Sequence, residues 1–311
     1  MKLNKLCIAA VGFAIAGSAM ASTTTLKGNF VKTTLTDRGV MNSLIYDPTG
    51  TQNFIPSTDY VAPGTPFEGF GVRYTGVTGG GVFVSNSNSG GQQIATLGAG
   101  MTLLSGGTSG GSASWTGQYG NDFTVTQLFS FSNTDQRVNI TTTLTALSSL
   151  VNVRVSRAVD PDPDNYSGGT AATNNQRGIV SPAVPKTDFV GSIGQISGRP
   201  LGLYYNGSLV HNAGIFSSCC SETNPDSYLA GGNMGDSSSG DNGIGLGFLL
   251  GDMASGASTS WSYAYVMGGS LGTIDIPTDP SGVPEPGTLA LLGLAGVAMA
   301  GMNKRRNKAS A

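Results

Sequence analysis

Residues 123–131 read FTVTQLFSF and contain the clearest structural pattern in this 311-residue chain. Aromatic and β-branched side chains recur at every second position, which is the period of a strand with one buried face. Gln127 and Leu128 interrupt the alternation, but the period of two predominates. The segment therefore predicts a half-buried β-strand.

The same period continues on the C-terminal side of this segment. Residues 133–136 have the composition of a turn, and two alternating runs follow it. The first run contains Val138, Ile140, Thr142 and Leu144, and the second contains Val151, Val153 and Val155. Because the connections are short, we expect three successive strands that pair antiparallel.

Short strand-like segments occur through the rest of the chain, separated by glycine-rich breaks. They lie at Leu26–Leu35, Gly69–Thr75, Leu201–Tyr205, Gly243–Leu250 and Trp261–Met267. Sustained helical periodicity is absent outside the termini, as is a repeat of propeller or solenoid length. The pattern predicts an all-β, antiparallel, β-sandwich-like domain over residues 22–278, with 160–178 as a place where it could divide in two.

The N-terminus has the layout of a secretory signal peptide, which we assign to residues 1–21. Lys2 and Lys5 precede an apolar run that is too short to cross a bilayer. Ala19 and Ala21 then provide the small side chains of a cleavage site, so the mature chain is expected to begin at Ser22.

The C-terminus combines a short motif, an apolar segment and a basic end, after a linker at residues 279–283. The motif is Pro284-Glu285-Pro286, and the apolar segment is residues 287–302. The basic residues are Lys304, Arg305, Arg306 and Lys308. These three parts, in this order over residues 284–308, resemble the PEP-CTERM sorting tail.

This resemblance implies recognition of the tail by an exosortase-type membrane protease. The apolar segment is about 24 Å long as a helix, which is short for a hydrocarbon core of roughly 30 Å and suits a transient anchor in the inner membrane. The positive-inside rule keeps the basic end cytoplasmic and places residues 22–283 outside, bound for the cell surface or the extracellular space. The resemblance also implies exopolysaccharide as a partner.

Composition narrows the function of the exported part. Of the chain's 16 Lys and Arg and 18 Asp and Glu, ten cations and 17 anions lie between Ser22 and Val283, which leaves a net charge of −7. This balance excludes a basic nucleic-acid-binding surface. Recurrent aromatic and β-branched residues, together with low overall charge, indicate a folded chain.

One internal motif has the composition of a metal loop. Asp160, Asp162 and Asp164 alternate with prolines and match the first three ligand positions of a calcium loop, with Asn165 at its turn. The twelfth position, where an EF-hand has glutamate, is Ala171. A calcium site completed by ligands from elsewhere and a solvated acidic loop are both consistent with the motif.

The mature chain retains two adjacent cysteines, Cys219 and Cys220. We expect a structural or oxidised pair, which includes a disulfide between them. Free thiols, an intermolecular bridge and a soft-metal site are the alternatives. A zinc site is disfavoured because there is no CxxC pattern and no histidine cluster.

No catalytic constellation is evident, so we expect a non-enzymatic protein. His211 is the single histidine and lacks a GxSxG motif, and Glu68 and Glu222 are the two glutamates of the domain. The main expectation is a structural or glycan-associated surface protein of exopolysaccharide or biofilm. The alternatives are an extracellular polysaccharide hydrolase and a surface-adhesion protein of the ice-binding type. The second alternative needs a regular threonine array, which the sequence does not display.

Overall fold

The computed structural model describes residues 23–277, except 77, 107–108, 167–168 and 218–219. Strands account for 53% of the described residues and helices for 4%, and the strands form antiparallel sheets, so the all-β prediction is confirmed. One short helix, α1 (Pro225–Leu229), and two 3₁₀ turns, Pro56–Thr58 and Leu271–Thr273, complete the regular structure of the described part.

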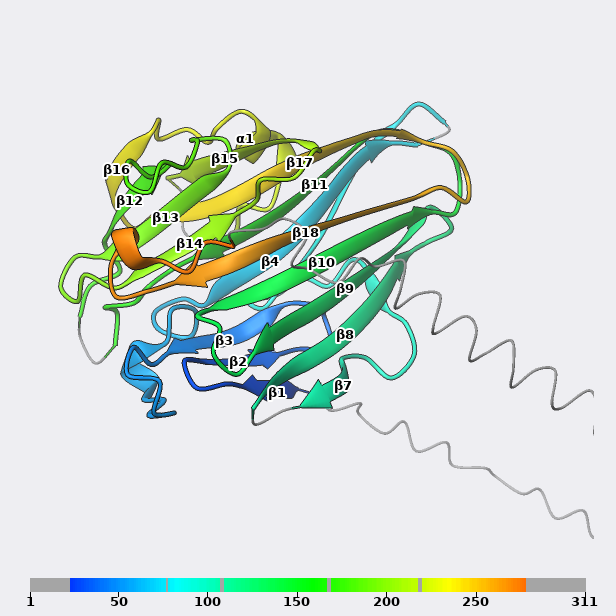
Figure 1. Cartoon of the computed structure of the whole chain (residues 1–311). Coiled ribbons are helices and arrows are strands. Elements are labelled where there is room, and N and C mark those ends of the chain that lie inside the picture. Colours follow the sequence, from blue (N-terminus) through cyan, green and yellow to red (C-terminus); the bar gives the residue numbers. More distant parts are fainter. Residues whose placement is uncertain (1–22, 77, 107–108, 167–168, 218–219, 278–311) are drawn as a thin grey trace, which may run out of the picture.

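Three antiparallel sheets build the fold (Figure 1). The ten-stranded sheet has the order β16 (Ser237–Gly240), β12 (Thr173–Arg177), β13 (Phe189–Gly194), β14 (Pro200–Tyr204), β18 (Ser258–Met267), β10 (Arg137–Ala146), β9 (Phe123–Ser132), β8 (Gly110–Tyr119) and β6 (Ala95–Thr96), and β7 (Thr102–Gly106) also pairs with β8. The five-stranded sheet has the order β15 (Val210–Phe216), β17 (Gly243–Met253), β11 (Leu150–Asp160), β4 (Phe67–Thr75) and β5 (Gly81–Ser87). The three-stranded sheet is β1 (Thr24–Lys27), β2 (Val31–Leu35) and β3 (Met41–Tyr46).

The three sheets share one hydrophobic core. A single cluster of buried side chains joins Val31 of the smallest sheet, Val72 of the five-stranded sheet and Phe129 of the ten-stranded sheet. Each sheet contributes one face, as in a β-sandwich. The opposite face of β8, β9, β10 and β18 is directed away from this core.

Strand β9 contains the segment with the clearest alternation. Phe123, Val125, Phe129 and Phe131 are buried, as the period of two predicts. Gln127 is buried among them because its Oε1 accepts a hydrogen bond of 2.8 Å from Nη1 of Arg157. The interruption at Gln127 and Leu128 is therefore a polar inward position beside an apolar outward one.

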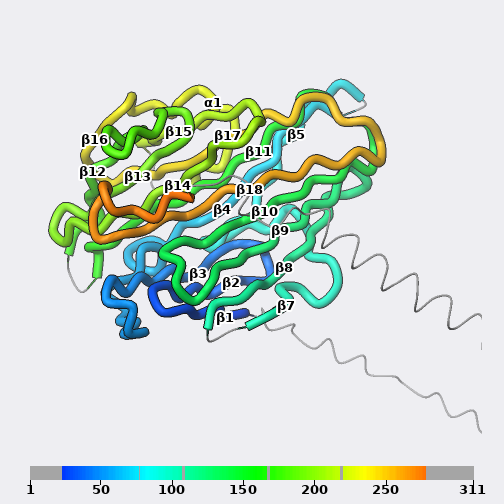
Figure 2. Tube along the Cα trace, in the orientation of Figure 1, coloured from blue at the N-terminus to red at the C-terminus, as the bar shows by residue number. Residues whose placement is uncertain are grey.

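Two expectations about the strands are wrong. Strand β10 pairs with β9 but not with β11, because β18 occupies its other edge and β11 enters the five-stranded sheet between β17 and β4 (Figure 2). Residues 26–35 form a hairpin of β1 and β2, closed by a hydrogen bond from Gly28 N to Val31 O. Periodicity identifies strands, but the choice of partner depends on tertiary packing.

A buried ion pair lies in the core where β4 and β11 meet. Arg157 and Glu68 pair through Nε and Oε1, and both side chains are fully buried. The Glu68 carboxylate also accepts hydrogen bonds from Tyr265 Oη (2.8 Å) and Met41 N (2.7 Å). Burial would lower the pKa of Arg157, but the Glu68 carboxylate raises it above its ordinary value. Burial also raises the pKa of Glu68, and Arg157 and the two hydrogen bonds oppose that rise. The core thus contains Arg157 and its partner carboxyl from the same chain.

Candidate functional site

An acidic cluster forms where β11 leaves the five-stranded sheet. Asp160 is the last residue of β11, and Asp162 follows after Pro161. Proline favours an extended backbone, which directs alternate residues to the same side. A hydrogen bond of 2.9 Å from Asp162 N to Tyr60 O holds this segment against the connection between β3 and β4. Asp241 reaches the same place from the turn between β16 and β17.

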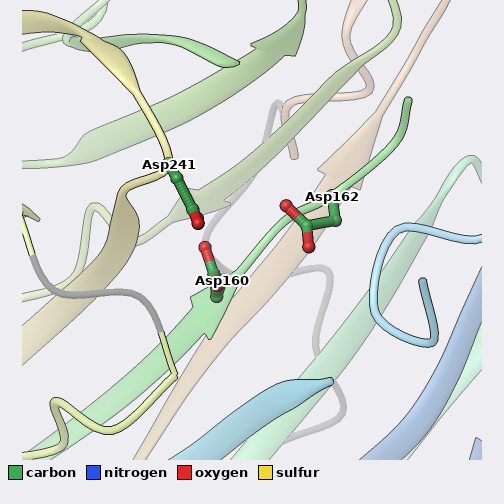
Figure 3. A group of neighbouring side chains, drawn as sticks. All are labelled: Asp160, Asp162 and Asp241. Carbon is green, nitrogen blue, oxygen red and sulfur yellow. The ribbon is translucent and has the colours of Figure 1, made fainter. Parts of the chain in front are cut away.

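The three carboxylates converge. One oxygen from each of Asp160, Asp162 and Asp241 lies within 4.8 Å of the others, and Figure 3 shows the carboxylates of Asp160 and Asp241 directed at one another. Asp160 is 2% exposed and Asp162 is 3% exposed, whereas Asp241 is exposed. The cluster therefore has a buried floor and one side open to solvent.

The buried part of the cluster is short of hydrogen-bond donors. Within the described part of the chain, Oδ1 of Asp160 and Oδ1 of Asp162 are buried without a partner. Oδ2 of Asp162 accepts a hydrogen bond from Asn165 Nδ2 at 3.1 Å. Sγ of Cys220 lies 3.4 Å from Oδ2 of Asp160, but Cys220 is disulfide-bonded, so its sulfur has no proton to donate. Buried polar atoms without partners are uncommon in native proteins and call for an explanation.

The electrostatics of the cluster disfavour three negative charges. Burial raises the pKa of Asp160 to about 8, and the nearby carboxylates of Asp162 and Asp241 raise it in the same direction. Burial raises the pKa of Asp162 to about 6, against the opposing effect of the Asn165 hydrogen bond. Burial also raises the pKa of Asp241. A cation or a shared proton would relieve this repulsion.

The donor set fits calcium. Ca²⁺ takes carboxylate oxygens at 2.3–2.6 Å, so ligands on opposite sides of one ion lie about 5 Å apart, which matches three oxygens within 4.8 Å of one another. Gly64 packs its bare Cα against this site. A Cβ there would lie 2.3 Å from Asp162 Oδ2 and 2.2 Å from Asn165 Nδ2. Water or backbone carbonyls would have to supply the remaining ligands.

The structure brings Asp160 and Asp162 together but directs Asp164 elsewhere. Oδ2 of Asp164 accepts hydrogen bonds from the backbone N–H groups of Ile196 (2.7 Å) and Ser197 (3.2 Å), in the turn between β13 and β14. Asp241 takes the third place in the cluster. It is distant from the motif in sequence, and Gly240-Asp241-Asn242-Gly243 reads as an ordinary turn. Local sequence therefore contains no signal that Asp241 belongs to the cluster.

Other polar residues considered from the sequence have structural partners. His211 contacts Asp188 Oδ1 through Nε2 (3.1 Å) and Leu209 O through Nδ1 (2.7 Å). Glu68 belongs to the buried ion pair described above. Glu222 accepts a hydrogen bond of 2.5 Å from Asn224 N at the start of α1. Trp115 and Trp261 are buried in the core, so they offer no exposed aromatic platform.

Several predicted sites fall outside the described residues. They are Ala19 and Ala21 of the signal peptide, Cys219, the motif Pro284-Glu285-Pro286 and the basic residues Lys304, Arg305, Arg306 and Lys308. The predicted transmembrane segment, residues 287–302, also lies there. Within the described residues, no helix has the length and apolar character needed to cross a membrane.

Comparison with known protein families finds one match, in the C-terminal tail. Residues 282–306 match the model of the PEP-CTERM protein-sorting motif. The C-terminal tail is a PEP-CTERM sorting motif. The motif implies export, membrane-linked sorting to the cell surface and an exosortase as processing partner. It covers the tail and not the β-sandwich.

Comparisons of the whole chain are less informative. No curated protein matches it significantly in sequence. Similar solved structures include a galactose mutarotase related enzyme from Lactobacillus acidophilus (8% identity, TM-score 0.43, 82% of this chain and 100% of that one). They also include a putative aldose 1-epimerase from Escherichia coli K12 (12%, 0.39, 79% and 98%) and an alpha-mannosidase from Enterococcus faecalis V583 (9%, 0.40, 81% and 30%). Likenesses at this level carry no functional information.

Proposed function

We propose that this chain is a non-catalytic protein of the cell surface or extracellular matrix, where its β-sandwich associates with exopolysaccharide. The observation that carries the proposal is the PEP-CTERM motif at residues 282–306, a sorting motif that would direct the exported sandwich to the cell surface. In this account the apolar segment 287–302 and the basic end anchor the chain in the inner membrane until the exosortase acts. The chain then moves to the surface or the extracellular space.

Mass spectrometry of the protein from its native host tests the sorting step. The extracellular form should begin at Ser22 and end near Pro284. Glu285→Ala, or loss of Arg305 and Arg306, should leave the chain uncut or mislocalised. Ser281→Ala, just before the matched residues, is the control and should be sorted normally. An intact C-terminus held in the membrane fraction of the unaltered protein would contradict processing.

The glycan-associated role is tested by binding without turnover. Burial of Glu68 against Arg157 removes one of the two glutamates from reach of a substrate, and Asp160 and Asp162 are almost fully covered. These observations support a non-catalytic role. The exported protein should be retained by native exopolysaccharide and release no reducing sugar. Release of reducing sugar that Asp160→Asn abolishes would establish the hydrolase alternative.

We also propose that Asp160, Asp162 and Asp241 hold a structural Ca²⁺. The supporting observation is the pair of buried oxygens without partners, Asp160 Oδ1 and Asp162 Oδ1, in a cluster of like charges. An ion here would tie the end of β11 to the turn between β16 and β17, since its ligands come from both. Calcium should therefore raise the melting temperature, and chelation should lower it. A melting temperature that is independent of calcium would contradict the site.

A further inference from the structure

The outward face of four neighbouring strands carries a regular set of hydroxyl groups, which we call the hydroxyl face. Each of β8, β9, β10 and β18 contributes three serines or threonines at alternate positions. They are Ser112, Ser114 and Thr116; Thr124, Thr126 and Ser130; Thr141, Thr143 and Thr145; and Ser258, Ser260 and Ser262. These strands are adjacent in the ten-stranded sheet (Figure 1).

Strand register aligns these hydroxyls into rows. Thr116 is opposite Thr126, Thr126 is opposite Thr143, and Thr143 is opposite Ser260, so one row crosses all four strands. The flanking rows contain Thr124, Thr145 and Ser258 on one side, and Ser114, Thr141 and Ser262 on the other. Thr141 is buried within its row, so the accessible hydroxyls of that row are those of Ser114 and Ser262. Neighbouring strands lie about 4.8 Å apart, and alternate residues of a strand about 6.7 Å apart. The face is therefore a two-dimensional array that extends across all four strands.

Hydrogen bonds between side chains hold the array in place. Oγ1 of Thr143 and Oγ of Ser260 are 2.9 Å apart, and the corresponding distances for Thr145–Ser258 and Thr141–Ser262 are 2.7 and 2.8 Å. Thr116 and Thr126 are paired at 3.0 Å. A hydroxyl can donate one hydrogen bond and accept two, so a paired hydroxyl keeps capacity for a ligand. Because the rotamers are already fixed, binding costs little side-chain entropy.

The chemistry of the face selects an uncharged, hydroxylated partner. A fourth row contains Ser112, Ser130, Asn139 and Ala264, and Gln118 and Leu128 complete the other rows, so no position of the array is charged. Ala264 is 2% exposed and packs in a second hydrophobic cluster, so the accessible part of the array ends before it. The exported part of the chain has a net charge of −7, which disfavours a polyanion. A second copy of the chain is a poor fit, because packed sheets meet through apolar side chains.

The shape of the face favours a flexible chain over a flat crystal. Neighbouring strands rotate by roughly 20–25° in a twisted sheet, so four strands turn through about 60–75°. A rigid ice plane would touch only part of the array, whereas a polymer chain can follow the twist and sum many weak contacts.

We propose that the hydroxyl face binds a neutral polysaccharide chain lying across β8, β9, β10 and β18. The inference rests on the proposed function, since it names the surface and the class of glycan with which the exported protein associates. Recognition occurs through hydrogen bonds to sugar hydroxyls rather than through aromatic stacking, because Trp115 and Trp261 are on the buried side of these strands.

Affinity electrophoresis of the mature protein tests the proposal, with dextran as a neutral probe and alginate as an anionic one. The main variant is Thr116→Val, Thr126→Val, Thr143→Val, which removes three hydroxyls and keeps the β-branched shape. The control is Thr25→Val, Thr34→Val, a cross-strand pair on the three-stranded sheet. Thr143→Glu is a second variant, with one charge placed at an outward position.

Dextran should slow the unaltered protein and the control equally. The triple valine variant should bind about tenfold more weakly or worse, as expected for three lost hydrogen bonds. Thr143→Glu should also weaken binding, with unchanged melting temperature. Retention by alginate alone, adsorption to ice without retention by dextran, or equal losses in the control would overturn the inference. If the variants bind native exopolysaccharide as well as the unaltered protein does, this surface is wrong but the proposed function stands. If the unaltered protein does not bind native exopolysaccharide at all, both proposals are refuted.

Discussion

Buried carboxylates occur at two sites, Glu68 on β4 and Asp160 with Asp162 at the end of β11, and the two sites are compensated in opposite ways. Glu68 is opposite Val159, one residue from Asp160, yet its charge is balanced by Arg157 and by hydrogen bonds from Tyr265 and Met41. Asp160 and Asp162 have other carboxylates as neighbours and buried oxygens without partners. At Glu68 the protein supplies its own cation, Arg157. At Asp160 and Asp162 it does not, so that is the site where a cation from solution would be bound.

The largest effect should follow from removing the internal cation. Arg157→Met leaves Glu68 buried without its counter-charge, which should lower the free energy of unfolding by about 3–5 kcal/mol in urea titrations. Arg154→Met is the control on the same strand. Arg154 pairs with Asp226 at a partly exposed position, so its loss should cost about 1 kcal/mol or less. Equal costs for the two variants would contradict the assigned role of Arg157.

The next effect concerns the cation from solution. Calcium at a hundred times its dissociation constant should add about 2.7 kcal/mol to the unfolding free energy, and Asp162→Asn should abolish this gain. Asp164→Asn is the matched control, because the Asp164 carboxylate accepts hydrogen bonds from the backbone of Ile196 and Ser197 and is not one of the proposed calcium ligands. Thermal melts with calcium and with chelator measure both. A calcium effect lost in Asp164→Asn but kept in Asp162→Asn would refute the assignment of ligands.

A smaller effect should have the opposite sign from the Arg157 variant. With chelator present at about pH 9, above the pKa of about 8 to which burial raises Asp160, Asp160→Asn removes one of three like charges and keeps the shape of the side chain, so it should be neutral or stabilising by about 1 kcal/mol. With calcium present, the variant should be the less stable protein. This crossover is measured by melting both proteins under both conditions, and parallel behaviour would argue against a metal site.

The smallest effect concerns Asp47, a buried carboxylate that is compensated by hydrogen bonds instead of a cation. Burial would raise the pKa of Asp47, but hydrogen bonds from Thr49, Asn53 and Thr51 lower it below its ordinary value of 3.8. A lowered carboxyl pKa stabilises the fold above the ordinary value, and this stabilisation disappears as the pH falls through the lowered value. Asp47→Asn should therefore cost about 1 kcal/mol at neutral pH and nearly nothing at roughly pH 2. A cost that does not change between these pH values would contradict this explanation.

Sequence periodicity could predict local structure and part of the acidic cluster. The alternation at Phe123–Phe131 gives β9 and its buried face, and the spacing of Asp160 and Asp162 gives two members of the cluster. The third member, Asp241, depends on how β17 is placed beside β11, which local sequence does not encode. The hydroxyl face was missed for the same reason: Thr143 and Ser260 face each other because β10 and β18 pair, across more than a hundred residues of sequence. Strand pairing is a tertiary choice, so a cross-strand array is visible only in the fold.

The most direct test is an isothermal calcium titration of the mature protein after treatment with chelator, with Asp162→Asn and Asp164→Asn in parallel. The account predicts one calcium site per chain in the unaltered protein and in Asp164→Asn, and no binding in Asp162→Asn. Absence of calcium binding to the folded, unaltered protein would contradict it.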